Sequence, residues 1–208
     1  MDKNVVKLAF AGRKFSGKDE FADMAEELYS FYTFSFSDQL KMIATQLFPF
    51  MKIDYPSEEK ETLVVYHNRE TGVSYTPRML WQNLDILPEI YPEIFVDMLN
   101  EEFNRFCKTC AGVGVGNNIR ALIKDVRRPA ELNYVRKMGF YLVYIESDNP
   151  RSFNKYSQHK SESYQDLIRE TSDKIIFNKR QENWKEFISE EVKCIAQEIG
   201  IEKRTENE

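Results

Sequence analysis

The stretch VVKLAFAGRKFSGKD, residues 5–19, decides the fold of this chain. Its apolar part, from Val5 to Ala11, ends at Gly12 and predicts a buried β-strand. After the glycine-containing turn, apolar residues recur between positions 21 and 28 with the spacing of one face of an α-helix. The sequence therefore predicts that the chain opens with a strand, a glycine loop and a helix.

The turn in this stretch, Gly12-x4-Gly17-Lys18, has the spacing of a phosphate-binding loop. Glycines let backbone N–H groups turn inward toward phosphate oxygens, and the helix that follows presents the positive end of its dipole. Lys18 adds a cation for the β- and γ-phosphates. A chance match on a glycine turn is the alternative, and the strand and helix around the loop disfavour it. We predict an ATP site formed by Gly12, Arg13, Lys14, Ser16, Gly17, Lys18 and Asp19.

Asp19 stands where a Ser or Thr that ligates Mg²⁺ normally follows the lysine. A carboxylate could hold the metal directly or through water, because Mg²⁺ keeps several of its waters. The same carboxylate would repel nucleotide phosphates unless the metal or Lys18 compensates. We therefore expect ATP and Mg²⁺ as the cofactors, with Asp19 as a metal ligand.

A second charged cluster, DVRRPAE at residues 125–131, directly follows another predicted strand. Ligands of open α/β sheets lie beyond the carboxyl ends of the strands, where the phosphate loop also points. Asp125 could bind a ligand of the Mg²⁺ ion or accept from the monophosphate, and Arg127 could clamp a phosphoryl group with two hydrogen bonds. Glu131 could orient Arg127 or the sugar. A solvated strand end that caps a helix is the alternative. The predicted catalytic residues are Lys18, Asp19, Asp125, Arg127 and Glu131, with Asp19 and Asp125 at the metal.

Alternating strands and helices predict a three-layer α/β/α fold of the P-loop kinase type with a five-stranded, mostly parallel sheet. The predicted strands are residues 5–11, 32–36, 121–126, 141–145 and 174–177. The predicted helices begin near residues 18, 40, 76, 93, 129 and 184, and Ser37 and Asp38 are the expected caps of the second helix. Residues 45–110 hold no convincing strand and predict a mainly helical, acceptor-binding insertion in a single domain, residues 1–208. Residues 147–166 predict a short lid.

Two further groups of side chains are candidates for substrate contacts. Arg78 and Gln82 are four residues apart on a predicted helix and share one face, so they could bind the α-phosphate and the base or sugar of an acceptor. An exposed helix surface is the commoner fate of such a pair. The predicted lid could close its cations over the transferring phosphoryl group, or it could be a mobile loop with scattered charge. The lid cations are Arg151, Lys155 and Lys160.

Composition limits the class of protein. The formal net charge of -5 argues against stable nucleic-acid binding, which needs a basic surface, but it allows a small phosphorylated ligand. The sequence shows neither an apolar run long enough to span a membrane nor a signal peptide. Three cysteines fit a reducing compartment, and Cys107-x-x-Cys110 lacks the second pair that a zinc site needs. We expect a cytoplasmic protein that binds small nucleotides and no membrane, and a homodimer is compatible with the sequence.

Several segments together resemble the bacteriophage deoxynucleoside monophosphate kinases, in the family's order from residue 6 to about residue 190. The matching segments are GRKFSGKDEFA, FSFSDQLK, TPRMLWQNL, YPEIFVDML, IKDVRRPAE, HKSE and IIFNKRQENWKEF. GKD in place of GK[ST], followed by DVRxPxE, is fairly specific for this group. The resemblance implies an ATP- and Mg²⁺-dependent kinase that makes dNDPs from dNMPs, in the host cytoplasm if the source is viral. By motif position it implies that Arg78 and Gln82 bind the acceptor and that Asp125, Arg127 and Glu131 belong to the active site. The predicted substrate-binding residues are Arg78, Gln82, Asp38, Arg127 and Glu131.

The chain also departs from the family pattern. Glu20 stands where a Thr usually follows GKD, Asp85 and Ile86 replace a Gly–Thr pair, and Phe95 replaces a Trp. These departures bear on which bases are accepted. Two other functions stay open: a kinase for another small phosphorylated acceptor such as phosphomevalonate, and a nucleotide-binding module that has lost catalysis.

Overall fold

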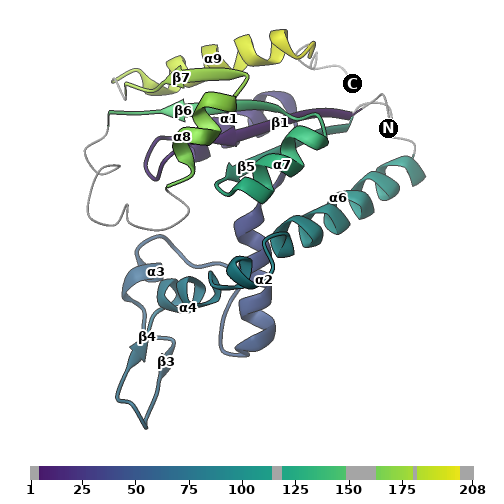
Figure 1. Cartoon of the computed structure of the whole chain (residues 1–208). Coiled ribbons are helices and arrows are strands. Elements are labelled where there is room, and N and C mark those ends of the chain that lie inside the picture. Colours follow the sequence, from purple (N-terminus) through teal and green to yellow (C-terminus); the bar gives the residue numbers. More distant parts are fainter. Residues whose placement is uncertain (1–4, 114–118, 149–162, 180–181, 202–208) are drawn as a thin grey trace. The chain divides into compact units, whose positions relative to one another are not determined.

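The computed structural model describes residues 5–113, 119–148, 163–179 and 182–201. Contacts between residues divide the chain into two compact units. Unit 1 consists of Met1–Phe34 and Glu102–Glu208, and unit 2 of Ser35–Glu101. Each unit has its own architecture, and the sheet belongs to unit 1 (Figure 1).

Unit 1 is built on a five-stranded sheet in which all neighbouring strands are parallel. The strand order is β2-β5-β1-β6-β7. The strands are β1 (Val5–Ala11), β2 (Tyr32–Phe34), β5 (Ile119–Val126), β6 (Tyr141–Glu146) and β7 (Lys174–Phe177). Most residues of β5 and β6 are buried, as expected where both faces of a parallel sheet are covered. The predicted five-stranded, mostly parallel sheet is confirmed.

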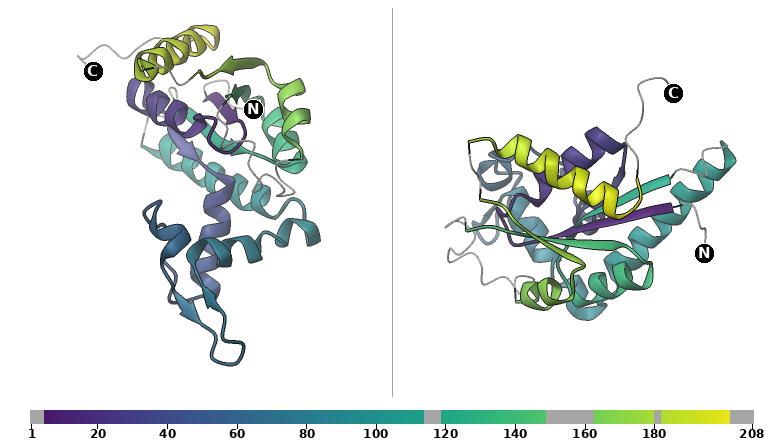
Figure 2. Two further views of the ribbon diagram at one scale, coloured as in Figure 1. Left: turned by 90° about the vertical axis from the view of Figure 1, so that its left-hand side faces the viewer. Right: turned by 90° about the horizontal axis from the view of Figure 1, so that it is seen from above.

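Helices cover both faces of this sheet (Figures 1 and 2). On one face lie α1 (Lys18–Tyr29) and α9 (Trp184–Glu198), and on the other lie α7 (Pro129–Lys137) and α8 (Gln165–Thr171). Phe21 of α1 joins the first layer to the sheet, because its ring lies 6.0 Å from that of Phe10 and 6.4 Å from that of Phe187. Burying such a ring stabilises the fold by about 1.5–3 kcal/mol. The predicted three-layer arrangement is confirmed.

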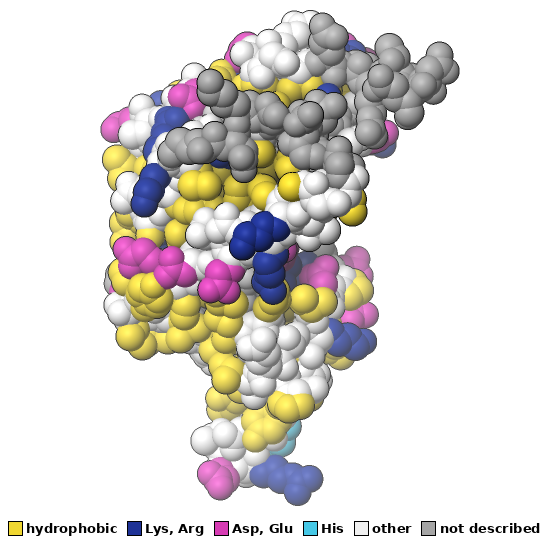
Figure 3. Space-filling model, turned by 90° about the vertical axis from the view of Figure 1, so that its right-hand side faces the viewer, with side chains coloured by type: hydrophobic (Ala, Val, Ile, Leu, Met, Phe, Trp, Pro, Cys, Tyr) yellow, Lys and Arg dark blue, Asp and Glu magenta, His cyan; other side chains and the backbone are white. Residues whose placement is uncertain are grey.

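Unit 2 contains helices and one short hairpin. The helices are α2 (Phe36–Leu47), α3 (Glu59–Thr62), α4 (Pro77–Leu84) and α5 (Leu87–Ile90), and α6 (Ile94–Gly112) begins in this unit and ends in unit 1. In the hairpin, β3 (Tyr66–His67) pairs antiparallel with β4 (Ser74–Tyr75). Figure 3 shows charged side chains at the tip of this hairpin.

The hairpin corrects one prediction, because the sequence indicates no strand in residues 45–110. Tyr66 pairs with Tyr75, and the chain reverses near Gly72, which has a φ of 71°. A ladder of two residues per strand is too short to produce the alternating pattern by which a strand is recognised.

The start of α2 corrects a second prediction. The helix begins at Phe36 rather than near Leu40, because the side chain of Ser35 accepts a hydrogen bond from the Asp38 backbone N–H at 3.3 Å. Ser35 is therefore the N-cap, in place of Ser37 or Asp38. β2 correspondingly ends at Phe34, two residues earlier than predicted.

Helix α8, which begins at Gln165 inside the predicted lid, was not predicted from the sequence. Its buried side chains, Gln165 and Ile168, are too few to give a clear apolar pattern in a polar segment. The lid cations Arg151, Lys155 and Lys160 lie outside the described residues. In the described part of the chain, no helix has the length and the apolar character needed to cross a membrane.

Candidate functional site

The loop between β1 and α1 is shaped by two glycines with positive φ, 151° at Gly12 and 96° at Gly17. A Cβ atom on Gly12 would lie 2.4 Å from the carbonyl oxygen of Ile145 and 2.6 Å from Ser16 Oγ. A Cβ atom on Gly17 would lie 2.3 Å from Asn178 Nδ2. Both positions therefore require glycine, because of their backbone conformation and because no side chain fits.

Asn178, the residue after β7, is a structural support of the loop that sequence reasoning missed. Its Nδ2 donates to the backbone oxygen of Ser16 at 2.9 Å, and its backbone N–H donates to the carbonyl oxygen of Glu146 at 2.8 Å. The side chain is buried. A polar residue directly after a strand, at the sheet edge where ligands bind, is the signal that could have found it.

Two groups of the loop fit a phosphate. The Lys18 side chain is only 7% exposed, and its Nζ lies 3.8 Å from Oδ2 of Asp19, whose side chain is 68% exposed. Ser16 Oγ is buried and has no hydrogen-bond partner among the described residues. Such a hydroxyl costs about 1–3 kcal/mol unless a partner satisfies it. A phosphate oxygen would satisfy it.

The other loop cations, Arg13 and Lys14, have contacts within unit 1. Arg13 Nη2 donates to Asp166 Oδ1 of α8 at 2.9 Å. Lys14 Nζ lies 4.9 Å from the ring centroid of Phe15, an exposed residue with a φ of 66°. Exposed ion pairs contribute only about 0–1 kcal/mol, so the Arg13 pair could be replaced by a stronger contact with a phosphate.

The sheet brings the loop and the cluster at residues 125–131 to one edge. β1 and β5 are adjacent and parallel, and Ala11 pairs with Val126. Gly12 and Arg127 are therefore the first residues beyond the carboxyl ends of neighbouring strands. Asp125 is buried, and the Arg127 side chain is half-buried.

Glu131 at the start of α7 holds the backbone of this cluster. Its Oε2 accepts hydrogen bonds from the backbone N–H groups of Arg127 at 2.7 Å and Arg128 at 3.0 Å. Burial, and then the nearby Asp125, raise the pKa of Glu131 to about 8, although the two N–H donors act to lower it. The carboxyl is buried, so orienting Arg127 fits its geometry better than contact with a sugar.

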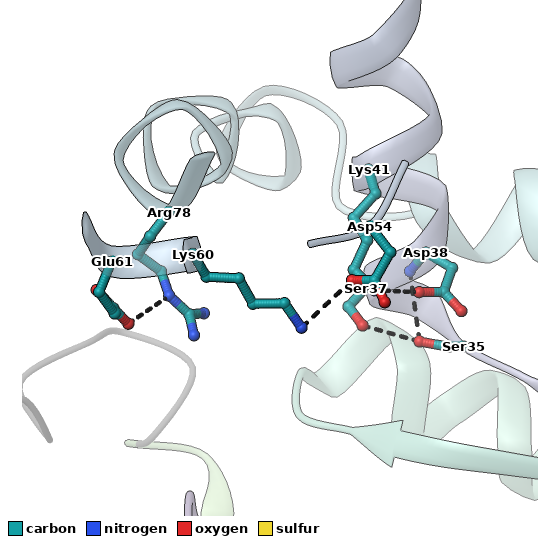
Figure 4. A network of polar contacts seen from close by, with 8 residues as sticks. All are labelled: Ser35, Ser37, Asp38, Lys41, Asp54, Lys60, Glu61 and Arg78. Atoms are coloured by element: carbon teal, nitrogen blue, oxygen red, sulfur yellow. Dashed lines mark hydrogen bonds and ion pairs between the residues drawn. The ribbon is translucent and has the colours of Figure 1, made fainter. Parts of the chain in front are cut away.

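The predicted acceptor residues Arg78 and Gln82 belong to unit 2. They lie one turn apart on α4, whose N-cap Thr76 accepts a hydrogen bond from the Met79 backbone N–H at 3.3 Å. Arg78 Nε donates to Glu61 Oε1 at 3.0 Å (Figure 4), and Gln82 is exposed. The predicted sharing of one face by Arg78 and Gln82 follows from this helix.

Asp38, the third acceptor residue predicted in unit 2, lies in the first turn of α2. Its Oδ1 accepts a hydrogen bond from Lys41 Nζ at 2.7 Å (Figure 4). Asp38 is therefore paired with a cation of its own helix.

Asp19 and Asp125 are the carboxylates predicted to meet Mg²⁺. In residues 5–113, 119–148, 163–179 and 182–201, no group of three or more His, Cys, Asp or Glu side chains could hold a metal ion. Mg²⁺ in phosphotransferases is usually held by one or two carboxylates, with water and substrate phosphates completing its shell. The Asp19 side chain is 68% exposed and therefore open to such an ion, whereas Asp125 is only 3% exposed.

Neither a protein-family model nor a curated protein sequence matches the chain. Among solved structures, it is similar to a dephospho-CoA kinase from Campylobacter jejuni, at 14% identity and a TM-score of 0.47 over 94% of this chain and 96% of that chain. It is also similar to a tunicamycin resistance protein from Deinococcus radiodurans, at 10% identity and a TM-score of 0.46 over 97% and 98% of the two chains. A shikimate kinase from Acinetobacter baumannii matches at 10% identity and a TM-score of 0.40, over 93% and 94%. Likenesses this distant carry no weight for the function, which rests on the residues of this chain.

Proposed function

We propose that the chain is a P-loop phosphotransferase that moves the γ-phosphoryl group of ATP to a deoxynucleoside monophosphate. The observation that carries this proposal is the pairing of Ala11 with Val126, which sets the phosphate loop beside Arg127 at one sheet edge. The buried side chain of Lys18 and the hydroxyl of Ser16, which lacks a hydrogen-bond partner among the described residues, support ATP as the donor. The resemblance to the phage kinases supports the acceptor class.

Phosphoryl transfer needs mainly positioning and neutralisation of charge. In unit 1, the loop N–H groups and Lys18 would bind the β- and γ-phosphates, and Arg127 would bind the transferring phosphoryl group with two hydrogen bonds. Glu131 would hold the backbone of Arg127 in place. In unit 2, Arg78 would bind the acceptor. Mg²⁺, when held by the predicted carboxylates, would supply positive charge against the phosphate oxygens.

A coupled assay of ADP release with each of the four dNMPs tests the proposal. We expect Mg-ATP-dependent turnover with at least one of them. Lys18→Ala should reduce kcat by about 100-fold or more, because one group that stabilises transition-state charge is lost. Lys137→Ala, which removes an exposed lysine at the end of α7, should leave turnover unchanged.

Four outcomes would contradict the proposal in whole or in part. A folded chain that turns over none of the four dNMPs is not this kinase. Turnover with a different phosphorylated acceptor would retain the phosphotransferase and replace the acceptor class. Binding of ATP in calorimetry without turnover of any acceptor would favour a nucleotide-binding module, and full activity of Lys18→Ala would show that the loop is not the ATP site.

A further inference from the structure

Charged side chains from three helices of unit 2, and from the loop between α2 and α3, gather in the region shown in Figure 4. We call Asp38, Lys41, Asp54, Lys60, Glu61 and Arg78 the charge cluster of unit 2. Lys41 Nζ of α2 and Lys60 Nζ of α3 lie 3.8 Å and 3.2 Å from the same oxygen, Asp54 Oδ1. Arg78 of α4 is bonded to Glu61, the residue next to Lys60. Two ammonium groups therefore lie within ion-pair distance of one carboxylate oxygen, and Lys41 is also bonded to Asp38 Oδ1 at 2.7 Å.

The cations of the charge cluster are less exposed than their partners. The exposed fractions of the side chains are 21% for Lys41, 22% for Lys60 and 36% for Arg78, against 63% for Asp54 and 54% for Glu61. Moving a cation out of water costs free energy, which is offset only while an anion stays in place. Because the carboxylates are the exposed partners, they can turn into solvent and leave the cations to another anion.

Asp54 is kept ionised by a backbone N–H group and by two ammonium groups. Burial opposes its ionisation, but the backbone N–H of Tyr55 and the ammonium groups of Lys41 and Lys60 keep its pKa below the ordinary value. Figure 4 shows Lys60 pointing toward Asp54, and the terminal nitrogens of Arg78 turned away from Glu61. A phosphate oxygen could take the place of Asp54 Oδ1, which lies 3.2 Å from Lys60 Nζ and 3.8 Å from Lys41 Nζ, while Lys41 keeps its bond to Asp38.

We propose that Lys60 and Lys41 form a subsite for the phosphate group of the acceptor, and that Asp54 is the counter-ion which this phosphate displaces. This subsite rests on the proposed function and deepens it, because only Asp38, Arg78 and Gln82 of unit 2 had been assigned to the acceptor. The ordinary alternative is an ion-pair network that only ties α3 to α2. In that case loss of the Asp54 charge would weaken the fold slightly and tighten no ligand.

The subsite and the purely structural ion-pair network differ in whether loss of the Asp54 charge tightens dNMP binding. Calorimetry on the full chain, without ATP, would measure the affinity for each of the four dNMPs and for the matching deoxynucleosides. Lys60→Met should weaken dNMP binding about tenfold or more, because a hydrogen bond to a charged group is lost, and should leave deoxynucleoside binding unchanged. Asp54→Asn should tighten dNMP binding several-fold. Arg69→Met, at the exposed turn of the hairpin, is the matched control and should change neither.

Further measurements keep the subsite and the proposed function distinguishable. Thermal unfolding shows whether each variant is folded, and Lys60→Arg should restore affinity by keeping the charge. If the wild-type chain turns over a dNMP but Lys60→Met binds it normally, or Asp54→Asn binds it more weakly, the subsite is wrong and the kinase stands. If phosphate-dependent binding follows these variants in a chain without turnover, the subsite stands and the kinase is wrong. If the wild-type chain binds no dNMP, both are wrong.

Discussion

Replacing Gly12 by alanine tests whether the phosphate loop is as tightly packed as the structure indicates. The new Cβ atom would lie 2.4 Å from the carbonyl oxygen of Ile145, a backbone atom of β6 that cannot rotate away. Overpacking of this kind costs about 1–3 kcal/mol. The φ of 151° adds strain of about 1–3 kcal/mol. The sum, about 2–6 kcal/mol, is a large part of the total stability of a typical domain, about 5–15 kcal/mol.

Thermal unfolding followed by circular dichroism is the assay. In a chain of this size each kcal/mol lowers Tm by about 2–4 °C, so Gly12→Ala should lower Tm by at least about 4 °C. Gly139→Ala is the matched control in unit 1, because Gly139 has a φ of 73° but nothing within 4 Å of its Cβ position. Gly139→Ala should lower the free energy of unfolding only by the backbone strain, about 1–2 kcal/mol. Equal losses in the two variants would refute the close packing of the loop, and so would unchanged ATP binding by Gly12→Ala in calorimetry.

Three more substitutions test single contacts of unit 1. Burial raises the pKa of Glu131 to about 8, above its ordinary 4.5, so the folded chain binds this proton more tightly than the unfolded chain does. The bound proton therefore stabilises the fold fully below pH 4.5, and this stabilisation is lost as the pH rises through 8. Glu131→Gln should therefore flatten the fall in unfolding free energy between pH 4.5 and about 8, by up to about 1.4 kcal/mol per pH unit. Asn178→Ala removes the hydrogen bond to the Ser16 backbone oxygen; it should cost about 1–3 kcal/mol in urea unfolding and raise the KM for ATP more than the KM for the acceptor. Asp19→Asn should raise the Mg²⁺ concentration needed for half-maximal turnover several-fold, whereas Asp23→Asn, one turn along α1, should not.

Each of these expectations has an outcome that would contradict it. Equal pH slopes for the wild-type chain and Glu131→Gln would show that the carboxyl does not take up a proton on folding. An unchanged KM for ATP in Asn178→Ala would show that Asn178 does not help to hold the loop in its ATP-binding conformation. The same Mg²⁺ requirement in Asp19→Asn as in Asp23→Asn would exclude Asp19 as a metal ligand.

Strong local patterns explain why much of unit 1 could be predicted. The apolar run of β1, the glycine spacing of the loop and the helical periodicity of α1 all lie within about 25 consecutive residues. The strand KIIF at Lys174–Phe177 was likewise recognised from its own residues. Arg78 and Gln82 were placed on one helix face because Thr76 and Pro77 mark the start of α4.

Local patterns were not enough in unit 2 or at the supports of the loop. The pairing of β3 with β4 involves only two residues of each strand. The cap at Ser35 was assigned to the neighbouring residues Ser37 and Asp38, which are equally suitable N-caps by residue type. The ion pairs of Lys60 and Arg78 join separate segments of unit 2, so no spacing in the sequence reveals them.

By itself, the sequence determined the strands of the sheet-bearing unit, its helices except α8, and the glycine loop after β1, because periodicity and glycine conformation act over a few neighbouring residues. Only the tertiary structure decided which distant groups secure that loop. Asn178 reaches the Ser16 backbone oxygen across 162 residues of chain, and Ala11 lies beside Val126. Such contacts depend on how the parallel strands are ordered in the sheet, and that order cannot be inferred from the residues next to each contact in the sequence.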